Sequence, residues 1–133
     1  SWPGQIAAGV VNDPVSSLDL APTVLQLAGH PVPAGMQGLN LLDSAAMTAR
    51  KAVFGADFNH SINPKAPPGR AVRSRWLVSG NWKLIHHRGV KGEAARIELF
   101  DLGQDPQEET NLAAREPATV EELMAMLDAW WAP

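Results

Sequence analysis

Cysteine is absent from the 133 residues of the chain. Its absence excludes disulfide frameworks, thiolate zinc sites and cysteine nucleophiles within these residues. The sequence also lacks any run of about 18 apolar residues, so it predicts no membrane-spanning helix. Neither sign of charge dominates, because 11 basic residues stand against 14 acidic ones and the formal net charge is -3. We therefore expect neither nucleic acid nor an anionic membrane as a partner.

The residues that are present suit a small globular protein. Hydrophobic residues make up 45% of the chain, which is an ordinary share and allows a modest core. The chain opens with Ser1-Trp-Pro-Gly, without a basic and apolar leader and without Met. We interpret this opening as that of a trimmed or truncated product.

The stretch DPVSSLDLAPTVLQLAG, residues 13–29, predicts a helix over 19–28. Asp19 is a favourable N-cap, since its carboxylate can accept hydrogen bonds from the amides of the next turn. Gly29 provides a left-handed stop, and two prolines follow it closely. We expect residues 30–50 to form a loop with a small apolar anchor at 39–42. One face of the helix carries apolar residues at helical spacing: Leu20, Val24, Leu27 and Ala28.

The second half of the chain alternates between β-rich runs and turn residues. Gly80-Asn81 separates two of these runs, which favours a hairpin. A turn begins at Asp105-Pro106 and continues to Asn111, where we expect Asp105 and Asn111 to bond to backbone groups. The four predicted strands are 51–58, 70–79, 82–88 and 97–102.

The C-terminal segment predicts an amphipathic helix. We expect Thr119 and Glu122 to form a capping box at its start. The apolar residues that follow are Val120, Leu123, Met124, Leu127, Trp130 and Trp131. So wide an apolar stripe must cover another layer. The predicted fold class is therefore α+β, with a small antiparallel four-stranded sheet covered by the C-terminal helix.

The first half contains a stretch that resembles the sulfatase family. VSSLDLAPTVLQLAG at 15–29, followed by GLNLL at 38–42, resembles the segment that sulfatases carry after their last active-site motif. The tripeptide WPG at 2–4 is similar to the one that precedes this segment.

The second half carries the same resemblance in the same order. ELFDL at 98–102 with DPQEETNL at 105–112 resembles the signature near a sulfatase C-terminus. Arg73 and WKLI at 82–85 match the strand pair that leads to it. Four motifs in register over nearly the whole chain identify it as similar to the C-terminal portion of an arylsulfatase-type enzyme.

The resemblance implies a parent enzyme with an alkaline-phosphatase-like fold. Such an enzyme cleaves sulfate esters with a formylglycine made from Cys or Ser in a C/S-x-P-x-R motif, beside a divalent cation, usually calcium. These parts belong to the preceding two-thirds of family members, and Ser1–Gln5 is no substitute because Gln5 stands where the motif needs Arg. We therefore expect no catalytic residue, metal ligand or cofactor here, with the remainder of a sulfatase polypeptide as partner.

The resemblance also implies two parts within the chain. Residues 1–50 would be the tail of the parent's large α/β domain, and residues 51–133 would form a C-terminal subdomain of sheet and helix.

Asp57 and His60 are candidates for lining a substrate cleft. They lie at a predicted strand end beside a proline-rich loop, where binding residues often occur. In the family this region can approach the substrate. The alternative is a turn in which Asp57 satisfies backbone groups.

Arg73 and His86 are further cleft candidates, because either side chain could reach a substrate anion. His86 and His87 face opposite sides of a strand, so they cannot share one metal. The alternatives are a half-buried histidine without a catalytic role and a solvated strand face. In the latter, basic residues such as Arg73 and Arg75 would pair with Glu93, Glu98 or Glu108.

Two kinds of function remain open on the sequence. One is the C-terminal portion of a sulfuric ester hydrolase, which completes the fold, walls the cleft and is inactive alone. Its parent could instead cleave phosphonates or phosphodiesters on the same scaffold. The other is a stand-alone, non-enzymatic binding module. In the first case the helix at 19–28 would lack a packing partner, and exposed apolar surface could drive self-association.

Overall fold

The computed structural model describes residues 9–59, 71–89 and 94–131. The chain divides into two compact units, Ser1–Ala49 and Arg50–Pro133. Among their described residues, the first contains a short 3-10 helix and two α-helices, and the second contains a sheet and one α-helix. Within the described residues, no helix is long and apolar enough to cross a membrane.

The first unit begins its regular structure with a 3-10 turn, η1 (Ser17–Asp19), which leads into α1 (Leu20–Leu27). The predicted helix at 19–28 is thus confirmed with a shorter α-helical part. The predicted cap is wrong. Ser16 caps the turn through a capping box with Asp19, and Asp19 makes no side-chain cap bond to α1. The 3-10 turn starts the helical segment at Ser17, two residues earlier than expected, which places Asp19 inside the turn.

Gly29 ends the helical segment with a φ of 74°, as the sequence predicts. The segment 30–50, predicted as a loop, contains an additional helix, α2 (Ser44–Ala49). Its start is fixed by Asp43, whose side chain accepts a hydrogen bond from the Ala46 amide at 3.0 Å. This aspartate cap, followed by alanines, is the local pattern that the loop prediction overlooked.

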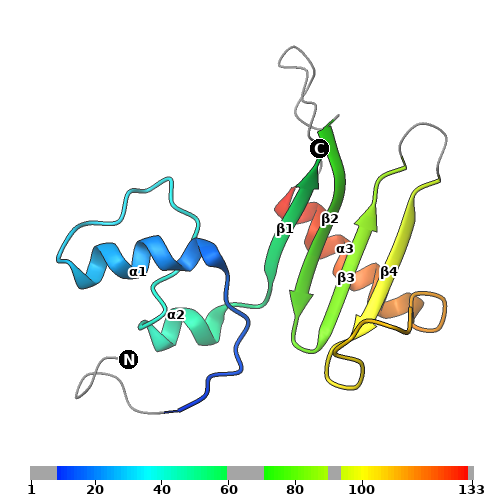
Figure 1. Ribbon diagram of the computed structural model, residues 1–133, viewed down its shortest axis with the longest axis horizontal. Helices are drawn as coiled ribbons and strands as arrows, with labels where there is room; N and C mark the ends of the chain where they lie inside the picture. Colours follow the sequence, from blue (N-terminus) through cyan, green and yellow to red (C-terminus); the bar gives the residue numbers. More distant parts are fainter. Residues whose placement is uncertain (1–8, 60–70, 90–93, 132–133) are drawn as a thin grey trace. The chain divides into compact units, whose positions relative to one another are not determined.

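The second unit is built on one antiparallel sheet in the order β1-β2-β3-β4 (Figure 1). The strands are β1 (Val53–Phe58), β2 (Val72–Ser79), β3 (Trp82–His87) and β4 (Arg96–Asp101). All four predicted strands are therefore present, with ends that differ by one or two residues. The turn between β2 and β3 has Gly80 at a φ of 56°, a conformation that favours glycine.

A single helix, α3 (Pro117–Trp130), crosses one face of this sheet and contacts β2 and β3 (Figure 1). The α+β architecture predicted from the sequence is confirmed. The predicted capping box is wrong, because the helix begins two residues before Thr119. Pro117 opens it after Glu116, which makes no side-chain cap bond. Proline suits this position, since its missing N–H would have no partner in the first turn.

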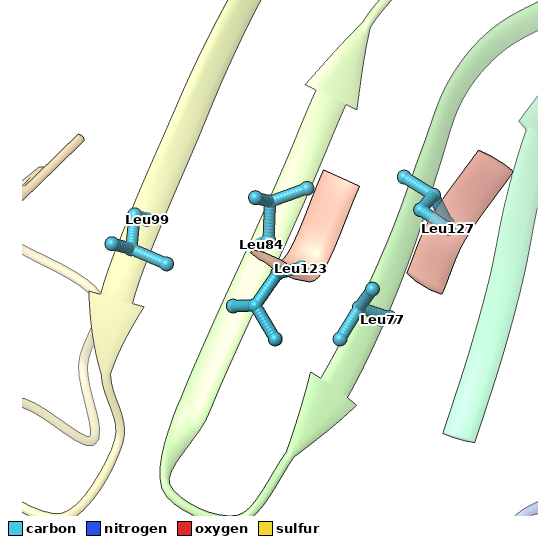
Figure 2. Close-up of a cluster of buried hydrophobic side chains, with 5 residues drawn as sticks. All are labelled: Leu77, Leu84, Leu99, Leu123 and Leu127. Carbon is cyan, nitrogen blue, oxygen red and sulfur yellow. The ribbon is translucent and has the colours of Figure 1, made fainter. Parts of the chain in front are cut away.

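Five leucines form the core between the sheet and α3 (Figure 2). Leu77 and Leu84 are paired across β2 and β3, and Leu84 is paired in turn with Leu99 on β4. Leu123 and Leu127 meet them from the helix, one turn apart. None of the five is more than 4% exposed, and burying each contributes about 1.5–3 kcal/mol. Side chains two residues apart on a strand point to the same face, and so do side chains four residues apart on a helix. The five leucines therefore face one another between the sheet and α3.

Aromatic rings hold the end of α3 against the edge strand β1. Trp130 stacks on Phe54 with ring centroids 5.2 Å apart, and Trp131 lies 6.0 Å from Phe58. Trp76 on β2 lies over Gly55, where an added Cβ would come within 2.3 Å of the indole. The register pairs Gly55 with Trp76, so the glycine leaves room for the ring.

Candidate functional site

Three of the four cleft candidates come from one end of the sheet. Asp57 is next to the end of β1, Arg73 is next to the start of β2, and His86 is next to the end of β3. Because neighbouring strands are antiparallel, these positions lie at the same end. The register places Asp57 opposite Ser74, and Arg75 opposite His86. His60, the fourth candidate, lies outside the described residues.

Arg73 and Asp57 are in contact with each other at the surface. The Arg73 Nε and an Asp57 carboxylate oxygen are 3.8 Å apart, with 58% and 56% of the two side chains exposed. A pair so long and so exposed contributes between 0 and about 1 kcal/mol to stability. Both side chains therefore remain accessible to a ligand that approaches this end of the sheet.

Arg75 occupies a very different environment from Arg73, although both lie on β2 two residues apart. Its guanidinium is buried and reaches the end of α3. One amino group donates to the backbone oxygens of Leu127 and Trp131, and the other donates to the Asp128 carboxylate at 2.8 Å. The interpretation of a solvated strand face is therefore wrong for Arg75. With its donors engaged inside the protein, Arg75 does not present a free anion site.

His86 completes this cluster from β3. Its Nδ1 lies 3.2 Å from the Arg75 guanidinium, which can only donate, so Nδ1 accepts and the ring is the neutral Nε2–H tautomer. Burial and, next, the positive charge of Arg75 lower the pKa of His86 below its ordinary value. A neutral imidazole of this kind offers an anion one N–H donor and no charge.

His87 faces the opposite side of the sheet, as the alternation along the strand predicts. Its Nε2 is 2.8 Å from a Glu98 carboxylate oxygen. Glu98 also lies 3.3 Å from Arg96, and Lys83 contacts Glu108 at 2.6 Å. The predicted ion pairs with Glu98 and Glu108 are thus present on this face, and the two histidines share no ligand.

The acidic turn after β4 is a structural element. Asp105 accepts hydrogen bonds from the amides of Glu109 and Thr110 through separate carboxylate oxygens. These bonds, with Thr110 first, lower the pKa of Asp105. Asn111 accepts from the Leu99 and Ala113 amides and donates to the Ile97 oxygen, tying the turn to β4. Both residues bond to backbone, as the sequence predicts.

The stretch at 15–29 is also structural, because its polar side chains bond to backbone groups as those of the turn after β4 do. The Asp19 carboxylate accepts from the Ser16 amide at 2.7 Å and from the Leu39 amide at 2.9 Å. The Thr23 hydroxyl donates to the Asp19 oxygen and accepts from the Leu41 amide. Gly38 passes so close to the chain that an added Cβ would stand 2.0 Å from the Leu18 oxygen. Residues 15–29 and 38–42 are therefore held together by side chains that bond to backbone groups and by a close backbone contact at Gly38.

Replacing Asp19 by alanine is expected to destabilise this scaffold by about 1–2 kcal/mol, the cost of losing a capping side chain. Asp19 is fully buried, so the Ser16 and Leu39 amides would lose their acceptor. Hydrogen exchange read by NMR should show loss of protection at the Leu39 amide. The amide of Leu84 in β3 serves as the control, and equal loss at both positions would contradict this local role.

The described residues contain no group of three or more His, Asp or Glu side chains that could hold a metal ion. The expected divalent cation therefore does not fit this part of the chain. We did not predict from the sequence that Arg75, His86 and Asp128 form a cluster. The feature that could have indicated it is the position of Arg75 two residues before Leu77, which puts its positive charge on the core side of a strand.

The match to one family model covers residues 1–130. Among curated proteins, the chain is 31% identical to arylsulfatase K of Xenopus laevis, over 91% of this chain and 22% of the relative. It is 32% identical to arylsulfatase K of Homo sapiens, over 86% of this chain and 22% of the relative. The chain thus spans about a fifth of the length of the curated relatives it matches.

Solved structures show the same fold. One comes from work on the metabolism of glycosaminoglycans by Bacteroides thetaiotaomicron, with a TM-score of 0.73 and 24% identity over 92% of this chain and 27% of that chain. Another, a protein in complex with its substrate D-glucosamine-2-N,6-O-disulfate, gives a TM-score of 0.60 and 25% identity over 84% of this chain and 22% of that chain. The chain belongs to the family described as N-sulphoglucosamine sulphohydrolase, C-terminal.

Proposed function

We propose that this chain is the C-terminal portion of a sulfatase-type sulfuric ester hydrolase, in which it completes the fold and walls the substrate cleft. The observation that carries the proposal is the family match over residues 1–130 in a chain about a fifth as long as its curated relatives. The partner is then the remainder of the sulfatase polypeptide. The chain by itself has no hydrolytic activity.

Residues 1–50 form the tail of the parent's large α/β domain in this proposal, and residues 51–133 form the C-terminal subdomain. Support comes from α1, whose apolar side chains at positions 20, 24 and 27 face solvent in this chain. The exposed fractions are 59% for Leu20, 62% for Val24 and 45% for Leu27. Such a stripe is the usual core face of a helix, and the parent's domain would cover it.

Asp57 and Arg73 are the residues that we propose to line the cleft most directly, with His60 beside them in sequence. The support is their exposure at one end of the sheet. Arg73 would bind a substrate sulfate or carboxylate, and Asp57 would accept from a hydroxyl. His86 could contribute only its Nε2–H, because Nδ1 is engaged with Arg75.

The bond-breaking groups belong to other parts of the proposed enzyme. A formylglycine nucleophile and a divalent cation, which we expect to be calcium, would come from the preceding sequence. No step of that chemistry is assigned to residues of this chain. Relatives include an N-acetylgalactosamine-6-O-sulfatase of Bacteroides thetaiotaomicron at 22% identity. We therefore propose a sulfated amino sugar as the substrate class, in preference to a phosphonate or phosphodiester.

The gene sequence immediately upstream of Ser1 tests this proposal directly. We expect an in-frame coding region with a C/S-x-P-x-R motif, whose Cys or Ser would become the formylglycine. An upstream stop codon with a start at this chain would contradict the proposal. A reading frame with the metal ligands of a phosphodiesterase and no such motif would instead favour the other chemistry.

A stand-alone binding module is the second candidate, favoured by the closed leucine core of residues 50–133. Limited proteolysis of the 133-residue chain distinguishes the two. In the sulfatase proposal, cleavage within residues 1–50 is fast and leaves a resistant product that contains α3. A module would protect both units, and equal resistance of α1 and α3 would favour it. Gel filtration of the same sample detects any self-association through the exposed stripe of α1.

A further inference from the structure

Besides the aromatic contacts with β1, the buried side chain of Arg75 joins the sheet to the end of α3 by hydrogen bonds. Its guanidinium donates to the Leu127 and Trp131 backbone oxygens and to the Asp128 carboxylate, all at the last turn of the helix. The Leu127 oxygen also accepts from the Trp131 amide at 3.1 Å, whereas the Trp131 oxygen lies past the last helical residue, where the helix offers no donor. Arg75 thus supplies a C-terminal cap from a neighbouring strand.

One contact of this cap depends on a histidine, a side chain that gains a positive charge in acid. Arg75 also donates to His86 Nδ1 at 3.2 Å, which requires that nitrogen to be unprotonated. Protonation of His86 turns Nδ1 into a donor, so two donors and two positive charges would face each other. Because a guanidinium stays protonated at all ordinary pH values, only His86 can change.

We infer that Arg75 and His86 form an acid-sensitive latch, which holds the end of α3 on the sheet when His86 is neutral and releases it when His86 is protonated. The released part includes Trp130 and Trp131, which pack on Phe54 and Phe58 of β1. Phe58 follows Asp57, so release would loosen the sheet end that holds the cleft candidates. The inference stands on this geometry and does not depend on the proposed function.

The other charged groups around His86 act in both directions. Asp128 on α3 favours protonation, whereas Arg75 on β2, His87 on β3 and Arg88, which follows β3, oppose it. The residue opposite His86 on β4 is Ile97, which carries no charge. Burial acts with the cations, and the net result is a lowered pKa. The released state therefore binds the proton more tightly than the latched state, so acid favours release.

Hydrogen exchange of the full 133-residue chain, followed by mass spectrometry and corrected for intrinsic rates, tests the latch. Protection of residues 127–131 should be complete above about pH 6.5, the ordinary pKa of histidine, and should fall as the pH drops below it, while the Leu84 amide stays protected. Each unit by which the pKa of His86 is lowered corresponds to about a tenfold change in the latch equilibrium.

Two variants and a control separate the latch from general acid sensitivity. His86→Gln keeps an oxygen acceptor for Arg75 but cannot be protonated, so it should remove the fall in protection. Asp128→Asn removes the carboxylate that favours a protonated His86 in the latched state and that accepts from Arg75, so it should weaken the latch and move the fall to higher pH. His87→Gln, on the other face, should retain it. Protection that is flat from about pH 8 to 5 in the unaltered chain, or an unchanged fall in His86→Gln, would overturn the inference.

Discussion

Leu84→Ala is expected to lower the free energy of unfolding of residues 50–133 by about 2–5 kcal/mol, and this is the largest effect that we predict. Leu84 lies on the inner strand β3, is fully buried, and is paired with Leu77 on one side and Leu99 on the other. Removal of its side chain leaves a cavity under α3, because strands on both sides restrict collapse (Figure 2). Denaturant unfolding followed by tryptophan fluorescence measures the loss.

Leu20→Ala provides the matched control for this substitution. Leu20 is on α1 with 59% of its surface exposed, so the same chemical change should alter stability by no more than about 0.5 kcal/mol. A loss at Leu20 as large as the loss at Leu84 would show that the stripe on α1 is covered in this chain. That result would count against the missing partner in the proposed function.

Arg75→Met is expected to cost about 3 kcal/mol, the second largest effect. Methionine retains an unbranched stem of similar shape but removes all the hydrogen bonds of the charged group, which contribute about 1.5–3 kcal/mol each when buried. The Trp131 oxygen loses its Arg75 donor and the Leu127 oxygen keeps only the Trp131 amide, whereas Asp128 remains half exposed and can be hydrated. This hydration keeps the cost well below the sum of the separate bonds.

Arg73→Met is the control, since it makes the same change two residues away on the same strand. The Arg73 side chain is 58% exposed, and the carboxylate of Asp57 with which it pairs is 3.8 Å away. We expect a change within about 0.5 kcal/mol. Equal costs for the two variants would show that burial and contact with α3 do not set the importance of Arg75.

Much of the fold could be predicted from local patterns. The turn at Gly80-Asn81, the alternation along β2 to β4 and the apolar stripe of α3 each state a local preference that the structure follows. The residues at which the two predicted helices begin were harder to predict. Ser16 and Pro117 take the positions that Asp19 and Thr119 were expected to hold, because several residues near each start can cap or open a turn.

The candidate site was less predictable for a physical reason. Arg73 and Arg75 have the same side chain on the same strand face, yet one is exposed and the other buried. The difference depends on where the last turn of α3 lies, and no short-range pattern in β2 encodes that position. The same holds for His86, whose neutral state is set by a guanidinium eleven residues away in sequence.

Turnover of an aryl sulfate such as 4-nitrophenyl sulfate tests most directly whether this chain is a supporting part of a sulfatase. The purified 133-residue chain should release no product above the buffer rate, with or without added calcium. A longer polypeptide that joins this chain to its upstream coding sequence should hydrolyse the ester once its formylglycine has formed. Sulfate release by the 133-residue chain alone would contradict the proposal that the bond-breaking groups lie in the preceding sequence.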